Sequence, residues 1–268
     1  MAIAWSAVYI LGMLACGYSE IVVLAVGTAA LAIFAVPRLM AFLRARRASD
    51  GEPARGVVIF VEPLRWLGVR WGRCETEAGL RRGGFRGEFR FWGWDPTWRA
   101  MLVLPTIAAK SFLATEAQRL ADHIAELRTS HSELPIHLIG YSCGGYIAAR
   151  ALELLPDNVR VDSCTLLAAA FSPWRDLNPA AMHVSGHFVV NSAPFDVVVG
   201  LGTIIVGTAD RVFTPSIGAL GYRGPKCEKI KQVRWRSGFA RLGYWGGHMS
   251  APAERFIAEC IVPAAGIS

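Results

Sequence analysis

A glycine–serine turn in the middle of the chain has the spacing of a site for a nucleophile. The sequence G-Y-S-C-G-G at 140–145 directly follows the apolar run 134–139 and opens a stretch of helical character. In a G-x-S-x-G turn between a strand and a helix, the serine backbone is strained and its hydroxyl is exposed. Side chains in place of Gly140 and Gly144 would collide with the crossing strand and helix. The pattern predicts Ser142 as a nucleophile, with an ordinary strand-to-helix turn as the alternative.

A serine hydroxyl is a poor nucleophile near neutral pH, so it needs a base within hydrogen-bond reach. Among six histidines, His248 lies in the sequence G-G-H-M-S at 246–250, a glycine-rich loop between the last expected strand and the last expected helix. There its ring could reach over the edge of a sheet. The other five have no such loop setting: His123, His131, His137, His183 and His187. We therefore expect His248 to be the base rather than a surface or packing histidine.

The acid that orients this base should follow one of the later strands, and spacing does not decide between the candidates. Asp196 comes directly after the expected strand 186–191, so its carboxylate would project from the carboxyl end of the sheet. Asp210 would take the role if 203–206 were the strand instead, although Arg211 beside it suggests an ion pair. We place Asp196 first, keep Asp210 as the alternative and retain Asp176 as a third candidate.

Attack of a serine on a carbonyl group creates an oxyanion, which needs two backbone N–H donors. We expect one from Cys143, because it follows Ser142 at the start of a helix, where the helix dipole favours negative charge. The other should come from the loop after the strand that ends at Val61. Pro63 has no N–H, so Leu64 is the better candidate. The cysteines show no metal-ligand spacing, and neither a metal ion nor another cofactor is expected.

Short apolar runs alternate with helical patterns after residue 55, which predicts an α/β fold with a mostly parallel sheet flanked by helices. Strands are expected at 56–61, 88–92, 136–139, 161–170, 186–191 and 231–235, and helices at 113–128, 144–155 and 252–260. The polar stretch 48–54 contains glycine and proline and is expected to link the domain 55–268 to what precedes it.

Residues 1–47 are expected to form a membrane anchor of one or two transmembrane helices. The runs 2–17 and 21–36 carry no charged residue. A span needs roughly 20 apolar residues, and the run 2–17 is shorter than this. The segment is therefore either a helical hairpin with Glu20 in its turn, which we favour, or a single span after a first segment that lies in the membrane interface. Basic residues next to a span stay on the cytoplasmic side. The arginines that follow the second run place the domain in the cytoplasm: Arg38, Arg44, Arg46 and Arg47.

The net charge of +7 does not come from a recognisable nucleic-acid-binding motif. Within 65–99, arginines are interleaved with tryptophans. In an anchored chain this mixture favours contact with an anionic lipid surface, and a solvated basic loop with core tryptophans is the alternative. The expected partners are therefore a membrane and a lipid-like or acyl-ester substrate, without nucleic acid, and the oligomeric state is left open.

From about residue 55 to 262 the chain resembles the α/β-hydrolase superfamily, especially its lipase- and esterase-like members. The resemblance rests on the G-x-S-x-G turn and on the chain order serine, acid, histidine. It implies that Ser142 forms an acyl-enzyme, that His248 acts as base and then acid, and that the aspartate holds the imidazole. The chain departs from the family in having no H-G-G-G after the first expected strand, where F-V-E-P-L stands at 60–64. The interval from Ser142 to His248 also leaves little room for a large lid domain.

Three functions are compatible with these residues. The first is a membrane-anchored serine hydrolase that cleaves an ester or thioester through a Ser-His-Asp triad. The second is a catalytically silent module of the same fold that binds a lipid or a partner at the membrane. The third is a peptidase or amidase, which differs from the first only in the leaving group. A serine, a loop histidine and an aspartate that converge would favour an enzyme over the silent module.

Overall fold

The computed structural model describes residues 39–40, 42–43, 51–62, 72–94 and 110–267. The chain divides into two compact units, Met1–Ala48 and Ser49–Ser268. The described residues of the first unit are helical and exposed. Within the described ranges, no helix has both the length and the apolar character needed to cross a membrane. The two uncharged runs that we expect to be spans, 2–17 and 21–36, lie outside the described residues, as do residues 48–50 of the expected linker.

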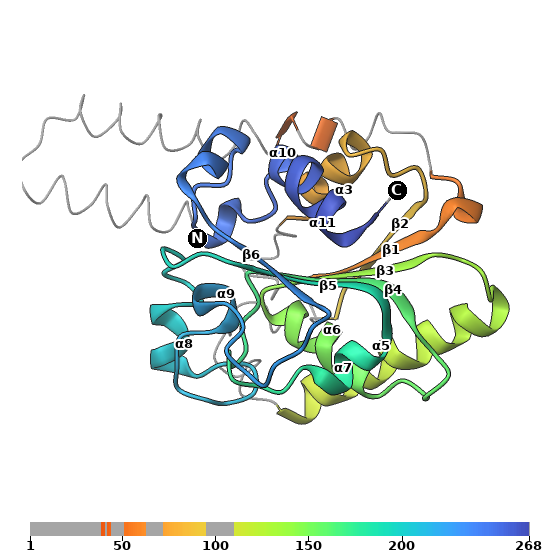
Figure 1. The fold of residues 1–268 in the computed structure, drawn as a ribbon, viewed down its shortest axis with the longest axis horizontal. Helices are drawn as coiled ribbons and strands as arrows, with labels where there is room; N and C mark the ends of the chain where they lie inside the picture. The colour runs from red at the N-terminus through yellow and green to blue at the C-terminus, as the bar shows by residue number, and fades with distance from the viewer. Residues whose placement is uncertain (1–38, 41, 44–50, 63–71, 95–109, 268) are drawn as a thin grey trace, which may run out of the picture. The chain divides into compact units, whose positions relative to one another are not determined.

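The second unit is built on six parallel strands in the order β2-β1-β3-β4-β5-β6 (Figure 1). The prediction of a parallel sheet flanked by helices is confirmed. β1 and β3 are buried along their whole length, as expected for apolar runs covered on both faces of a sheet. All six carboxyl ends meet at one edge of the sheet. The strands are β1 (Val57–Val61), β2 (Glu88–Trp92), β3 (Ile136–Tyr141), β4 (Val161–Leu167), β5 (Val184–Ser192) and β6 (Ile230–Arg234).

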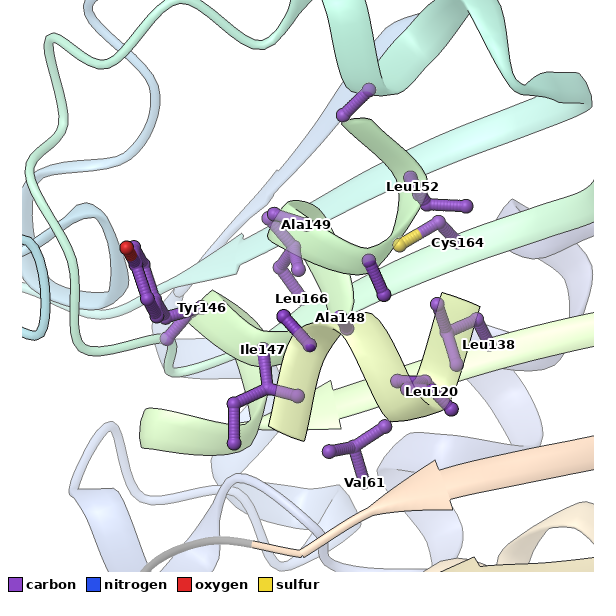
Figure 2. Packing of buried hydrophobic residues seen from close by; sticks show 14 of the residues in the cluster. Val61, Leu120, Leu138, Tyr146, Ile147, Ala148, Ala149, Leu152, Cys164 and Leu166 are labelled. Carbon is purple, nitrogen blue, oxygen red and sulfur yellow. The ribbon is translucent and has the colours of Figure 1, made fainter. Parts of the chain in front are cut away.

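One face of the sheet is covered by α5 (Lys110–Ser130), α6 (Cys143–Glu153) and α7 (Asn178–Met182) (Figure 1). Figure 2 shows side chains of α6 packed among residues of α5 and of the strands. Small residues such as Ala148 and Ala149 let α6 lie close to the sheet, and both are fully buried. This tight packing fixes the first turn of α6, which follows Ser142 directly.

The opposite face is covered by α3 (Arg73–Arg82), α10 (Glu254–Phe256) and α11 (Val262–Ala265) (Figure 1). A wider π-helical turn at Ile257–Ile261 joins α10 to α11. Phe256 and Ile257 are fully buried there, and the tilted ring of Tyr244 packs against that of Phe256 with centroids 4.4 Å apart. These residues belong to a second buried hydrophobic cluster, which holds the chain on either side of the loop that contains His248.

The structure corrects three of the predicted elements. The segment 203–206, which we considered as an alternative strand, belongs to the helix α8 (Leu201–Val206), and Ile204 and Ile205 are exposed rather than buried in the sheet. β4 ends at Leu167, three residues before the predicted end at Ala170. The closing helical region continues beyond Cys260 to Ala265. Three further helices, α3, α7 and the short α9 (Ile217–Leu220), were not predicted.

His137 on β3 makes the stability of this domain sensitive to acid. Its ring is buried, and Nδ1 lies 2.9 Å from Ser163 Oγ. Burial lowers the pKa of His137 below its ordinary value. The unfolded chain therefore binds a proton at this position at a higher pH than the folded chain does, and the folded state loses stability as the pH falls below about 6.5.

We expect His137→Gln to flatten this dependence. Between about pH 6.5 and 5, urea unfolding of the parent should show a slope of up to about 1.4 kcal/mol per pH unit from this one group. The slope should be smaller in the variant, whose amide cannot titrate. Equal slopes in the two proteins would contradict this explanation.

Candidate active site

Ser142 occupies the turn between β3 and α6 in a backbone conformation that few residues adopt. Its φ is 56° and its ψ is −124°. Three backbone hydrogen bonds hold it there: its N–H donates to Leu167 O, and its carbonyl oxygen accepts from the N–H groups of Gly145 and Ala170, each at 3.0 Å. A strained conformation persists only when its surroundings determine it in this way. The strained backbone agrees with the prediction from the G-x-S-x-G spacing, whereas Ser142 is buried rather than exposed.

The glycines around Ser142 are required by close backbone approach. A Cβ atom on Gly144 would meet the carbonyl oxygens of Val61 and Glu62 at the end of β1, and one on Gly140 would lie 2.6 Å from Gly145 Cα. The structure thus shows the collisions that we expected from the sequence. The collision at Gly144 arises because the first turn of α6 lies directly on the end of β1, and the collision at Gly140 arises because β3 lies close to α6.

His248 reaches Ser142 from the loop that follows β6. It begins the single 3-10 turn His248–Ser250, and its Nε2 lies 3.0 Å from Ser142 Oγ. Tyr141, the residue before the serine, holds the histidine in two ways. Its hydroxyl donates to His248 O at 2.7 Å, and the two rings stack with centroids 5.1 Å apart. The backbone and the ring of His248 are therefore both fixed relative to β3.

Asp196 lies on the other side of the imidazole, in the turn that follows β5. Its Oδ2 is 2.9 Å from His248 Nδ1, and its Oδ1 accepts a hydrogen bond from Val199 N–H at 3.2 Å. A carboxylate accepts hydrogen bonds only, so Nδ1 is the donor and Nε2 is left as the acceptor for the Ser142 hydroxyl. The exposed fractions of Ser142, His248 and Asp196 are 7%, 8% and 1%. A continuous, shielded hydrogen-bond chain thus connects the three side chains.

The two other candidate acids have different partners. Asp210 Oδ1 accepts from Ser172 N–H at 2.9 Å and from the Thr208 hydroxyl at 2.6 Å, which holds a turn together. The role of Asp210 as the alternative acid depended on a strand at 203–206, and the chain is helical there. Asp176 Oδ1 accepts from the backbone and side chain of Asn178 at the start of α7.

Of the two expected oxyanion donors, only Cys143 is among the described residues. It is the first residue of α6, so its amide lies at the positive end of the helix dipole. Leu64 lies outside the described residues. Glu62, two residues before Leu64, is described: its N–H donates to Trp92 O, and its carbonyl oxygen accepts from the indole of Trp94. In the described part of the chain, no group of His, Cys, Asp and Glu side chains could hold a metal ion.

Sequence reasoning missed the supporting residues of the site. Tyr141 was part of the recognised motif, but nothing in its spacing signalled a contact with His248, a hundred residues further along the chain. Tyr244 is fully buried near Asp196, and its hydroxyl lies 3.2 Å from Asn191 Oδ1 on β5. Burial raises the pKa of Tyr244, and the charge of Asp196 adds to this effect. The Tyr244 hydroxyl is therefore neutral and bonds to Asn191 on β5.

Comparisons with known proteins agree with this topology. A family model described as alpha/beta hydrolase fold matches residues 94–189, a range that includes the Ser142 turn. Together with the parallel sheet, this match supports an α/β-hydrolase fold for the chain. No curated protein matches the sequence.

Several solved structures are similar to the chain. Trichoderma reesei cutinase, in complex with a C11Y4 phosphonate inhibitor, is 15% identical over 87% of this chain and 90% of its own, with a TM-score of 0.40. An acetylxylan esterase is 14% identical over 81% and 97%, with a TM-score of 0.44. A cutinase-like protein from Cryptococcus sp. is 13% identical over 82% and 100%, with a TM-score of 0.41.

The close approach at Gly144 can be tested by adding a single carbon atom. Gly144→Ala should lower the free energy of unfolding by about 3 kcal/mol, because the new methyl group has backbone rather than flexible side chains in its way. Gly202→Ala in α8 is the matched control. There the nearest atom to the new Cβ is Val197 O at 3.8 Å, so alanine should be neutral or stabilise by up to about 1 kcal/mol. Similar thermal unfolding of the two variants would refute this explanation.

Proposed function

We propose that the protein is a serine hydrolase that cleaves an ester or thioester through an acyl-enzyme. One observation carries this proposal: the hydrogen-bond chain from Ser142 Oγ through the His248 ring to the Asp196 carboxylate. A nucleophile, a base within reach of it and an acceptor that orients the base are the parts that serine hydrolysis requires. The α/β-hydrolase fold supports the assignment by analogy, since a fold alone does not determine the chemistry.

The proposed reaction uses each of the three side chains at a defined atom. Ser142 Oγ attacks the substrate carbonyl carbon while His248 Nε2 takes the hydroxyl proton. The tetrahedral intermediate then collapses, the bond to the alcohol or thiol breaks, and His248 returns the proton to the leaving group. Water, deprotonated by the same nitrogen, attacks the acyl-enzyme and releases the acid and free Ser142. Asp196 keeps Nδ1 protonated throughout and stabilises the imidazolium that forms.

The backbone around the nucleophile supports charge stabilisation in this reaction. We assign the Cys143 N–H as one oxyanion donor, because it lies at the N-terminus of α6 next to the attacking oxygen. Leu64 N–H remains our proposal for the second donor. The buried thiol of Cys143 itself has no role in the proposed chemistry.

We further propose a lipid-like acyl substrate and a membrane location. The support is the amino-acid sequence: two uncharged runs within 1–47, arginines directly after them and a mixture of arginine and tryptophan within 65–99. Held by such an anchor on the cytoplasmic face, the enzyme would meet acyl chains at the bilayer surface.

A fluorophosphonate probe tests for an activated serine. The detergent-solubilised parent should be labelled, and labelling should be lost in Ser142→Ala and in His248→Ala, because the first lacks the nucleophile and the second lacks its base. Circular dichroism of the variants provides the control for folding. A folded parent that the probe does not label would instead indicate a catalytically silent module.

Two matched substitutions test the choice of aspartate. With a p-nitrophenyl acyl ester, Asp196→Asn should lower kcat by about 10⁴-fold, because an amide can donate to Nδ1 and so favour the wrong histidine tautomer. Asp210→Asn should retain most of the activity, since its amide oxygen can still accept from Ser172 and Thr208. Loss of activity in Asp210→Asn with retention in Asp196→Asn would overturn the assignment.

A further inference from the structure

An apolar surface begins beside the candidate active site and is out of keeping with the rest of the second unit. In the described part of that unit, eight of the eleven exposed large hydrophobic side chains lie within 195–213. We use the name α8 face for seven of them: Val197, Leu201, Ile204, Ile205, Val206, Val212 and Phe213. Their exposed fractions range from 38% to 71%. Single exposed hydrophobic residues are ordinary, but a cluster of this kind marks an interaction surface.

The most exposed part of the α8 face is held rigidly. Thr208 holds the turn 208–212 together: its backbone N–H donates to Val212 O, its carbonyl oxygen accepts from Arg211 N–H, and its hydroxyl oxygen accepts from Val212 N–H. Asp210 braces the same turn against Ser172. Arg211 sits at the tip with φ at 63°, a strained conformation for a non-glycine residue. This bracing holds Val212 and Phe213, which is 71% exposed, out in solvent before any ligand arrives.

Arg211 is a basic residue exposed at the tip of the α8 face. Of the two aspartates of the segment, Asp196 bonds to His248, and Asp210 is partly buried and bonds to Thr208 and Ser172, whose neutral groups leave its negative charge in place. The ring of Phe195 packs against that of Trp235, with ring centroids 5.3 Å apart. This contact joins the segment 195–213 to the end of β6. There Arg234 and Arg236 are exposed, and residues 229–253 contain no acidic residue.

We propose that the α8 face binds the surface of an anionic lipid bilayer, with Phe213 and Ile205 inserted among the acyl chains. Aliphatic and aromatic side chains beside basic ones are the combination that interfacial segments use. A second copy of this chain fits less well, because a symmetric contact would bring each arginine close to its equivalent. The proposal does not depend on catalysis, and binding is measurable in a protein without the serine hydroxyl.

Docking of this kind would bring the candidate site to the membrane. Asp196 lies in the same segment as the α8 face and bonds directly to His248, and α8 begins only a few residues later. In Figure 1, α8 lies at the outer end of its layer rather than between the sheet and another helix. An acyl ester in the bilayer would then meet Ser142 with little transfer through water.

The test places a nitrobenzoxadiazole fluorophore on the α8 face of the full chain, in a Ser142→Ala background with Cys16, Cys74, Cys227 and Cys260 replaced by serine. Phe213→Cys carries the probe, and Glu133→Cys is the matched control. Glu133 is exposed just before β3, at the opposite end of that strand from Ser142. The protein is reconstituted into vesicles of phosphatidylcholine with or without phosphatidylglycerol. Fluorescence is quenched by aqueous iodide or by phospholipid that carries a doxyl group on its acyl chain.

The proposal predicts that the probe at 213 is shielded from iodide several-fold relative to the probe at 133 and is quenched by doxyl lipid. It also predicts that the doxyl quenching weakens without phosphatidylglycerol, since the arginines then lose their partners. Equal iodide quenching at the two positions would overturn it. Shielding from iodide without doxyl quenching would also overturn it, because protein would then cover the α8 face, either a second copy or the chain's own residues 1–47.

Discussion

The contact between the first turn of α6 and the end of β1 is the constraint on which the site depends. Gly144 lies against the carbonyl oxygens of Val61 and Glu62, and only a residue without a side chain fits there. Ser142 lies two residues before Gly144, in the tight turn that leads to this contact, and has unusual backbone angles there. The position of α6 on the sheet and the strained backbone of Ser142 therefore depend on each other. The packing of α6 between α5 and the sheet supplies the stability that offsets the strain.

The parallel sheet brings the partners of Ser142 to the same edge. Asp196 follows β5 and His248 follows β6, so both arrive at the carboxyl ends of their strands, as β3 delivers the serine. The loop from β6 to His248 is long. Tyr141 on β3 bonds and stacks with the histidine, and Tyr244, within the loop itself, is fully buried. The elements that carry the fold thus also set the geometry of the three side chains.

Local patterns in the sequence were enough to predict the strands and the position of Ser142, because apolar β-branched runs and a glycine-serine turn carry their own conformational preferences. They were not enough for 203–206, whose threonine and isoleucines resemble a strand. In the structure they lie in a helix with exposed isoleucines, and Asp210 bonds to Ser172 and Thr208. Tyr141 shows a similar limit, since its contact depends on residues far away in the sequence. The proposed Leu64 donor and the expected spans concern residues that the structure does not describe.

The identity of the residue that a fluorophosphonate modifies, by forming an O–P bond with loss of fluoride, tests the central proposal most directly. After reaction of the parent protein with a fluorophosphonate and digestion with trypsin, fragmentation mass spectrometry of the peptide 129–150 locates the adduct. We predict that it lies on Ser142, whose hydroxyl is 3.0 Å from His248 Nε2. An adduct on the neighbouring Cys143, or on a residue outside this peptide, would contradict the proposed mechanism.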